Sequence, residues 1–347
     1  RPQHRLIRTR RTDASLWFRP RGPEWPRLDH VRLEFAGEAD SQGVGTLLEG
    51  WRIAAMSNAN DDTRPALATR YSELVSVAWC GPRVLLRAVG RAAPTFAEEV
   101  EHLAALADWA RQAMAGSARE DAVVTALQDL RRAVASQSAG KKPKLVCFAS
   151  DPDEALQLCQ HLRRRLGTFE VASVLHNASA ANAAAAVEAF RSDAQAWVLV
   201  ADRSGEEGLN LQFAHGMVHA DLPFSAGRVE QRIGRLDRFG RRAGAILHRV
   251  VLPDDDEEAP WRGWFDLLAN GFKVFSRSIS DVQFRLEALD ATVAGLLLSD
   301  GPLAVGEFAA EVEAELTQER TKLDEQHALD NMALLADDAS PLVDAIE

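Results

Sequence analysis

Residues 231–241, Gln-Arg-Ile-Gly-Arg-Leu-Asp-Arg-Phe-Gly-Arg, are rich in arginine and contain two glycines. The arginines recur at a spacing of three: Arg232, Arg235, Arg238 and Arg241. This spacing predicts that they share one helical face or one tight turn. Guanidinium groups that point the same way suit a polyanion, above all a transferring phosphoryl group. For an isolated cluster a solvated basic helix would be favoured, because charge runs usually face water, so the preceding segments must decide.

Short apolar runs alternate with helical patterns around this cluster. Strands are expected at residues 145–149, 171–175, 197–201, 217–219 and 245–252, and helices at 151–167, 180–191 and 227–236. This alternation predicts an α/β fold with a doubly wound parallel sheet. Ligands of such a sheet bind at the loops that follow the carboxyl ends of its strands.

The loop after the third of these strands, residues 202–211, contains Ser204, Gly205, Gly208 and Asn210. Glycine gives backbone N–H groups the freedom to turn toward a phosphate. Taken alone, such a loop is more often an ordinary turn. The phosphate-binding interpretation is favoured here because of where the loop stands in the order of strands and helices.

That order resembles the second RecA-like lobe of superfamily 2 helicases and translocases, in particular the Swi/Snf group. Residues 145–150 are similar to the strand of motif IV, residues 204–214 (SGEEGLNLQFA) to motif V, and residues 231–241 to motif VI. Residues 221–225 (DLPFS) stand where the group has an aspartate and a turn made of an aromatic residue, Asn and Pro. Within this group, the residues of these motifs resemble those of bacterial ATPases that recycle RNA polymerase. The resemblance is strong over residues 141–252, weak over 1–140, where residues 4–11 resemble the exit from the first lobe, and faint past 260.

The resemblance implies a role for each matching residue. Arg235 and Arg238 would act as arginine fingers on the ATP phosphates, and Gln231 would orient them. Further cofactor-binding residues would be Gly208, Arg232 and Asp237. Nucleic-acid contacts, for which double-stranded DNA is expected, would involve Ser150, His176, Asn177, Ser204, Gly205 and Asn210. At these strand ends we expect backbone N–H groups to meet phosphates without reading bases.

Two positions depart from the family pattern. Arg241 stands where motif VI often closes with glutamine, and Glu206 and Glu207 stand where motif V often has small residues. We expect the two glutamates to weaken a phosphate contact near the loop.

A phosphate-binding P-loop requires G-x-x-x-x-G-K-[ST], and no lysine of the chain lies in that context. Asp153-Glu154 looks like the acidic metal motif of helicases, but residues 150–152 separate it from the strand. Capping and the helix dipole explain these acids better. We therefore expect no metal site in this chain. ATP and Mg²⁺ would be held mainly by a first RecA-like lobe, upstream of Arg1 or on another polypeptide.

Four segments are expected along the chain. They are a connector in residues 1–39, a helical insertion in 40–140, the second RecA-like lobe in 141–259, and a helical brace with an acidic tail in 260–347. Outside the lobe we expect a strand at 31–35 and helices at 43–55, 69–78, 96–113, 118–136, 261–298 and 302–335. An apolar stripe, Phe308, Val312, Leu316 and Leu323, favours packing on the lobe, and a partner-binding surface is the alternative.

The net charge of −11 and the isoelectric point near 5.4 argue against a generally basic nucleic-acid binder. They allow a basic groove on one face, because nucleic-acid binding depends on how the charges are distributed over the surface and not on the net charge alone. Cys80, Cys147 and Cys159 fit no disulfide or metal motif and are expected to be reduced thiols. With no signal peptide and no long apolar run, we expect a cytoplasmic protein without a membrane partner.

The sequence thus predicts the C-terminal half of an ATP-dependent nucleic-acid translocase or helicase, working with the N-terminal RecA-like lobe of the same protein. RNA polymerase recycling, genome maintenance and phage defence are the candidate tasks, with RNA polymerase or a defence-system protein as partner. The alternative is a catalytically inert lobe that binds nucleic acid or protein. Intact Gln231, Arg235 and Arg238 favour the enzyme. A nucleotide-sugar transferase lobe would share the sheet, but no sugar-nucleotide site accompanies it.

Overall fold

The computed structural model describes residues 30–34, 43–137, 142–176, 178–206, 208–238, 241, 245–253, 259–323 and 325–326. The expectations for residues 4–11, for Asn177 and Glu207, and for the acidic tail beyond residue 326 lie outside this part of the chain.

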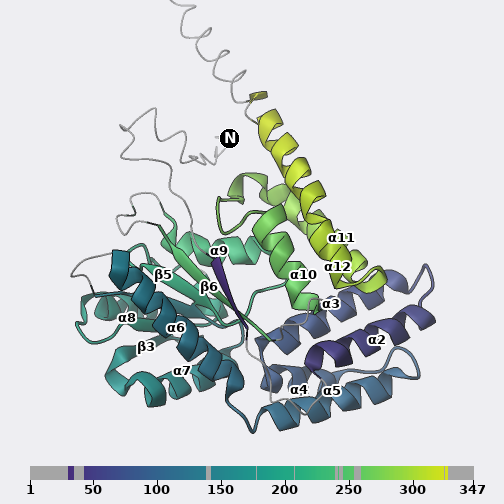
Figure 1. The fold of residues 1–347 in the computed structure, drawn as a ribbon, viewed down its shortest axis with the longest axis horizontal. Helices are drawn as coiled ribbons and strands as arrows, with labels where there is room; N and C mark the ends of the chain where they lie inside the picture. The colour runs from purple at the N-terminus through teal and green to yellow at the C-terminus, as the bar shows by residue number, and fades with distance from the viewer. Residues whose placement is uncertain are drawn as a thin grey trace, which may run out of the picture.

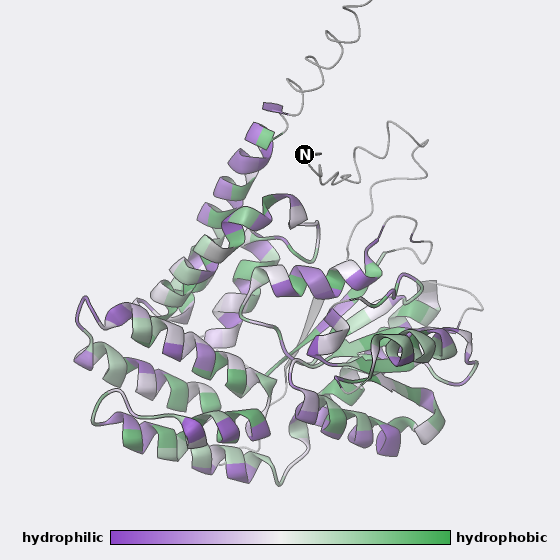
Figure 2. Ribbon diagram, turned by 180° about the vertical axis from the view of Figure 1, so that it is seen from behind, coloured by the Kyte–Doolittle hydropathy of each residue, from purple (hydrophilic) through white to green (hydrophobic). Residues whose placement is uncertain are grey.

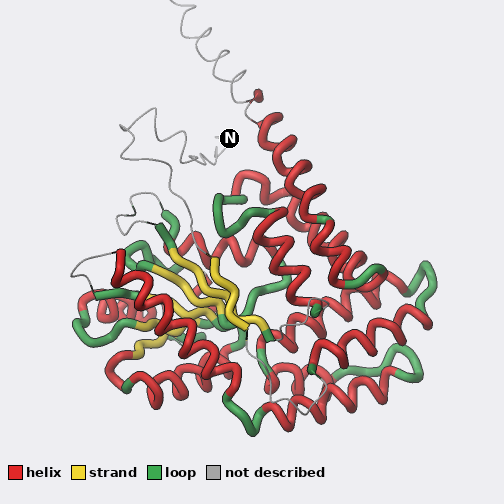
Figure 3. Tube along the Cα trace, viewed as in Figure 1, coloured by secondary structure: helices red, strands yellow, loops and turns green. Residues whose placement is uncertain are grey.

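The described strands form one parallel sheet in the order β1-β6-β5-β2-β4-β3 (Figures 1 and 3). They are β1 (His30–Glu34), β2 (Leu145–Phe148), β3 (Val171–Val174), β4 (Val198–Ala201), β5 (Gly216–His219) and β6 (Leu247–Leu252). The predicted RecA-like parallel sheet is confirmed. The strand expected at 31–35 is confirmed as β1, which pairs with β6 at one edge of the sheet.

Each central strand is buried on both faces, because successive residues point into two different helical layers. Leu145 and Cys147 of β2 belong to a core cluster with α6 (Ala118–Gln137) and α7 (Pro152–Leu166). Val146 and Phe148 belong to the cluster that includes α8 (Ala180–Ser192) and α9 (Ala226–Leu236). The strands are accordingly largely hydrophobic along their length (Figure 2).

A layer of helices lies beside the sheet: α2 (Val44–Asn58), α3 (Arg64–Cys80), α4 (Pro82–Arg91) and α5 (Glu99–Ala113) (Figure 1). The sequence predicted α2, α3 and α5 but not α4. The chain turns from α3 into α4 at Gly81, whose φ of 142° is left-handed. A side chain there would lie 2.6 Å from the Glu154 carboxyl carbon, so the corner presses directly against α7.

Packing continues across two of the expected segment boundaries. α6, expected within the helical insertion, lies on the sheet and places Val123, Leu127 and Leu130 in its core. β1, expected within the connector, is a strand of the same sheet. Trp79 of α3 also donates its indole N–H to the Val251 carbonyl of β6, at 2.9 Å. The division into four domains itself stays a prediction.

The C-terminal helices are α10 (Pro260–Asp266), α11 (Gln283–Ser299), α12 (Pro302–Glu307) and a helix over residues 309–323. The helical stretch expected at 261–298 is interrupted at residues 272–279. Val312 and Leu316 are buried, and Phe308 and Leu323 pack against the same core cluster. The stripe is therefore part of the protein core, and α11 contacts both α3 and α9. Packing of the stripe on the lobe itself stays a prediction.

Cys80, Cys147 and Cys159 are free thiols, as predicted. Burial raises the pKa of the Cys147 thiol to about 12, so it stays protonated. Within the residues that the structure describes, no helix has the length and apolar character needed to cross a bilayer.

Candidate nucleotide and nucleic-acid site

Three predicted contact residues follow neighbouring parallel strands. Ser150 comes after β2, His176 after β3 and Ser204 after β4, and these strands are adjacent in the order β2-β4-β3. The carboxyl ends of parallel strands meet at one edge of a sheet, and the structure places all three residues there. We call this edge the strand-end edge.

Two buried aspartates bind the strand-end edge together. The Asp202 carboxylate accepts hydrogen bonds from the backbone N–H groups of His176 (2.6 Å) and Ser204 (2.9 Å) and from the Ser204 hydroxyl (2.6 Å). The Asp221 carboxylate accepts from the Ser150 backbone N–H (2.8 Å) and hydroxyl (2.5 Å). Both aspartates are fully buried, so these charge-assisted bonds tie β3 to β4 and β2 to β5.

These bonds contradict part of the expected phosphate contact. The backbone N–H groups of Ser150, His176 and Ser204 already donate to buried carboxylates, and that of Gly205 donates to the Asp202 carbonyl at 2.9 Å. Gly205 is itself buried, and a side chain there would lie 2.9 Å from the Ala201 Cβ. The expectation that these four amides meet phosphates is therefore wrong, because each N–H group is already satisfied within the protein.

Other groups at the strand-end edge do face solvent. Asn210 is exposed, Gly208 has a left-handed φ of 80° with open space around its Cα, and the His176 side chain is 51% exposed. Arg203, which follows β4 and Asp202, is also exposed and adds a cation that the sequence analysis did not select. The sequence could have indicated this residue, because a basic side chain in a loop at the end of a strand is suited to bind a phosphate.

The four arginines of residues 231–241 fall into two pairs. α9 ends at Leu236, so Arg232 and Arg235 lie on the helix and Arg238 and Arg241 lie beyond it. The four arginines therefore share neither of the two expected arrangements, one helical face or one tight turn. Arg232 and Arg241 are buried, with 0% and 3% of their surface exposed. Arg235 and Arg238 are partly exposed, as are Gln231 and Asp237, at the last turn of α9 and just after it.

Arg232 serves the interior of the protein. Its guanidinium donates to the Glu206 carboxylate (2.8 Å), to the Asp221 carboxylate (3.1 Å) and carbonyl (2.7 Å), and to the Ser150 hydroxyl (2.5 Å). Burial alone would lower its pKa, but Asp221 and then Glu206 outweigh burial and raise the pKa above its ordinary value. This corrects the expectation that Arg232 binds the nucleotide, because its donors are used within the fold.

Glu206 is the partner that sequence reasoning misjudged. It is 2% exposed and binds Arg228 with both carboxylate oxygens, each at 3.0 Å, as well as Arg232. The expectation that this residue weakens a phosphate contact is wrong, because its charge points inward and is compensated by two arginines of α9. Glu206 thus anchors the motif V segment to the motif VI helix.

Two further contacts join these segments. The Leu211 backbone N–H donates to the Arg235 carbonyl at 3.1 Å. Arg241 donates to the carbonyls of Gln212 (2.9 Å) and Ala214 (2.7 Å), which gives a structural role to the arginine that departs from the family pattern. The loop that carries Asn210 and the helix end that carries Arg235 are therefore held as one unit.

The acids at the start of α7 have structural partners. The Asp151 side chain accepts from the backbone N–H groups of Asp153 (3.0 Å) and Glu154 (3.1 Å), so Asp151 is the helix cap. Asp153 and Glu154 lie in the first turn of α7, as expected from the helix dipole, but neither of them is the cap. Asp153 pairs with Arg87 of α4. Glu154 is buried and accepts from the Arg83 backbone N–H at 2.9 Å, so these acids bind the helical layer.

Residues 125–240 match the family model described as the helicase conserved C-terminal domain. Among curated proteins, the RNA polymerase-associated protein RapA of Vibrio vulnificus (strain YJ016) is 32% identical over 199 residues, which cover 55% of this chain and 20% of that protein. The protein of the same name from Pseudomonas putida (strain GB-1) is 35% identical over 134 residues, 38% of this chain and 14% of that protein. The chain thus spans about a fifth or less of the length of these relatives.

Two solved structures are similar to the chain at low sequence identity. The Sulfolobus solfataricus SWI2/SNF2 ATPase core in complex with dsDNA gives a TM-score of 0.48 at 13% identity and covers 78% of this chain and 48% of that one. The C-terminal part of the Fun30 ATPase domain gives 0.44 at 11% identity and covers 80% of this chain and 100% of that one. Residues 125–240 therefore form a helicase conserved C-terminal domain on the parallel sheet, and this part of the chain is similar to the RapA proteins.

Proposed function

We propose that this chain is the C-terminal half of an ATP-dependent translocase or helicase that acts on nucleic acid, with double-stranded DNA as the substrate. The observation that carries the proposal is the support of Arg235 and Arg238. Both are partly exposed, Arg235 in the last turn of α9 and Arg238 just after it, while Arg232 of α9 is fixed by two buried acids. Arginine forks on a rigid support suit phosphoryl transfer, which depends on positioning and charge neutralisation.

In this proposal ATP and Mg²⁺ are held mainly by an N-terminal RecA-like lobe of the same protein. Arg235 and Arg238 reach across the cleft to the phosphates, and Gln231 orients them. Gly208 and Asp237 line the nucleotide side of this lobe. A guanidinium there neutralises the charge that develops on the transferred phosphoryl group.

The nucleic acid lies along the strand-end edge in this proposal. Arg203, the His176 ring and the Asn210 amide are exposed groups that support phosphate contacts. Because the loop with Asn210 is bonded to the helix end with Arg235, nucleic-acid binding and ATP turnover are coupled. Similarity to proteins named as RNA polymerase-associated favours RNA polymerase as the protein partner over a defence-system protein.

We predict that the 347-residue chain alone will not hydrolyse ATP, because its sequence has no P-loop lysine and no metal-binding acids in the expected context. The measurement is phosphate release with and without duplex DNA, alone and with the N-terminal lobe added. Hydrolysis at an ordinary motor rate by the chain alone would contradict this prediction. If the paired lobes also stay inactive while DNA still binds, the inert binding module becomes the better function.

Binding of the whole enzyme to DNA should be independent of sequence and should weaken steeply as salt rises, because phosphates supply the contacts. Arg203→Ala should weaken binding to every duplex and reduce the slope of log affinity against log salt by about one. Titrations on unrelated duplexes at several salt concentrations measure both effects. Strong preference for one sequence, or an affinity indifferent to salt, would favour a specific binding module instead.

ATP turnover of the whole enzyme can be followed while duplex DNA is titrated in. In this assay Asn210→Ala should reduce the stimulation of turnover by DNA and leave ATP affinity nearly unchanged. Gln195→Ala is the matched control, because Gln195 is also exposed but precedes β4, at the opposite edge of the sheet. If Asn210→Ala and Gln195→Ala change the stimulation equally, Asn210 does not couple DNA binding to ATP turnover.

A further inference from the structure

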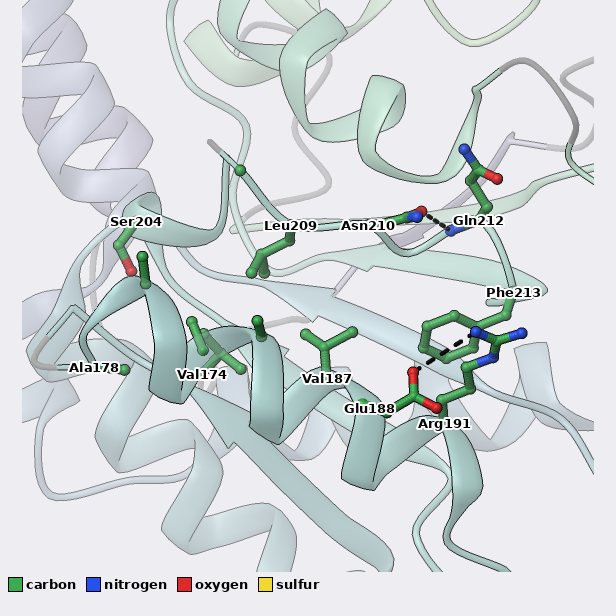
Figure 4. Close-up of a pocket in the computed structure, with 14 residues that line it drawn as sticks. Val174, Ala178, Val187, Glu188, Arg191, Ser204, Leu209, Asn210, Gln212 and Phe213 are labelled. Atoms are coloured by element: carbon green, nitrogen blue, oxygen red, sulfur yellow. Dashed lines mark hydrogen bonds and ion pairs between the residues drawn. The ribbon is translucent and has the colours of Figure 1, made fainter.

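A pocket of about 500 Å³ lies between α8 and the loop of residues 208–213 (Figure 4). Ala180, Ala183, Ala184 and Val187 line it from one face of α8, at the i, i+3, i+4, i+7 spacing of a helical stripe. Leu209 and Phe213 line the opposite wall. Both walls of the pocket therefore carry apolar side chains. Because the alanine side chains of α8 are small, they leave open space between the helix and the loop.

The polar groups of the pocket come mainly from the loop. Asn210 and Gln212 contribute side-chain amides, and the side-chain oxygen Oδ1 of Asn210 accepts from the Gln212 backbone N–H at 3.4 Å. Arg191 and Glu188 bring opposite charges to the lining and pair with each other at 3.6 Å. These two charges are exposed and of opposite sign, so the apolar interior between α8 and the loop suits a neutral, flat, partly polar ligand better than a phosphate.

The pocket opens beside the strand-end edge. Ser204 and Ala178 lie at one end of it, and Phe213 and Arg191 lie at the other (Figure 4). A strand whose phosphates follow Arg203 and His176 would therefore pass the Ser204 end, within reach of the apolar interior. Phe213 is tilted against Phe190 at 5.9 Å, which holds its ring in place.

We infer that this pocket binds a single nucleobase that has left its pair in the bound DNA duplex. An apolar slot of this size accepts a planar ring, an aromatic side chain offers a stacking surface, and amide groups pair with base edges. The inference rests on the proposed nucleic-acid function and adds to it a contact to bases, independent of the phosphate contacts.

The test compares two single-stranded oligonucleotides with the same number of phosphates, one with bases and one with abasic sites throughout. The whole enzyme should bind the base-bearing strand about tenfold more tightly, the size of one stacked base. Ala184→Leu fills the pocket and should remove this preference. Ala185→Leu, at an exposed position of the same helix outside the pocket, should preserve it.

Equal affinity for the two strands in the unaltered enzyme would overturn the inference, and so would a tenfold preference that survives Ala184→Leu. Loss of RNA polymerase binding by Ala184→Leu, with the base preference intact, would instead show a protein-docking pocket. Both leucine variants should keep the salt dependence of binding. If the unaltered enzyme shows no salt-dependent binding at all, the proposed function fails and the inference falls with it.

Discussion

Arg235→Ala and Arg238→Ala should each lower the ATP turnover of the whole enzyme by about a thousandfold or more, with ATP affinity nearly unchanged. The guanidinium stabilises charge that is present only in the transition state, so its loss appears in kcat. Arg→Lys should not restore turnover, because an ammonium lacks the planar fork that meets two phosphate oxygens. Steady-state kinetics at saturating DNA measure kcat and KM for each variant.

Arg111→Ala is the control for these variants. Arg111 lies on α5 and is 60% exposed in a pair with Asp108, so its removal should leave turnover and stability nearly unchanged. If both Arg235→Ala and Arg238→Ala keep a near-normal kcat, these two arginines support the fold and the arginine-finger proposal fails.

The sheet could be predicted because its strands are short, continuous apolar runs separated by helical patterns. Such runs report burial on both faces, which is a local property of the sequence. The predicted strands 145–149, 171–175 and 197–201 contain β2, β3 and β4. Helix α4 escaped prediction because its signals, Gly81 and Pro82, mark the end of one helix and the start of the next without an intervening loop.

The roles of the arginines could not be predicted from their spacing. Whether Arg232 faces a nucleotide or the interior depends on Glu206 and Asp221, acids from other elements that reach it in the folded chain. The same holds for the strand-end amides, which are taken by Asp202 and Asp221. Spacing shows which groups are near one another along a helix, whereas partners from other elements decide which of them remain available to a ligand.

The ion pairs around Arg232 extend to the helical layer. Arg119 of α6 lies 3.6 Å from Asp221 and 3.8 Å from Glu154, and Glu154 accepts from the Arg83 backbone N–H of α4. Glu206 connects this group to the motif V segment. Buried charges of this kind contribute little net stability when complete, but the loss of one member leaves the others uncompensated.

Glu206→Gln should therefore lower the free energy of unfolding by about 3 kcal/mol or more, because it removes a buried charge that compensates Arg228 and Arg232. Urea unfolding of this chain measures the change. Glu188→Gln is the matched control, since Glu188 is 69% exposed and pairs with the 60% exposed Arg191. An exposed pair of this kind contributes about 0–1 kcal/mol, so the control should unfold almost like the unaltered chain.

The cost should depend on Arg232 itself. In Arg232→Met the buried guanidinium is absent, so adding Glu206→Gln should cost less than in the unaltered chain, and a double-mutant cycle measures that coupling. In the whole enzyme, Glu206→Gln should also lower kcat more than it changes KM, because α9 then supports Arg235 less firmly. A loss below about 1 kcal/mol with no coupling to Arg232 would mean that the fold compensates these arginines without Glu206, and that motifs V and VI are held together by Leu211 and Arg241 instead.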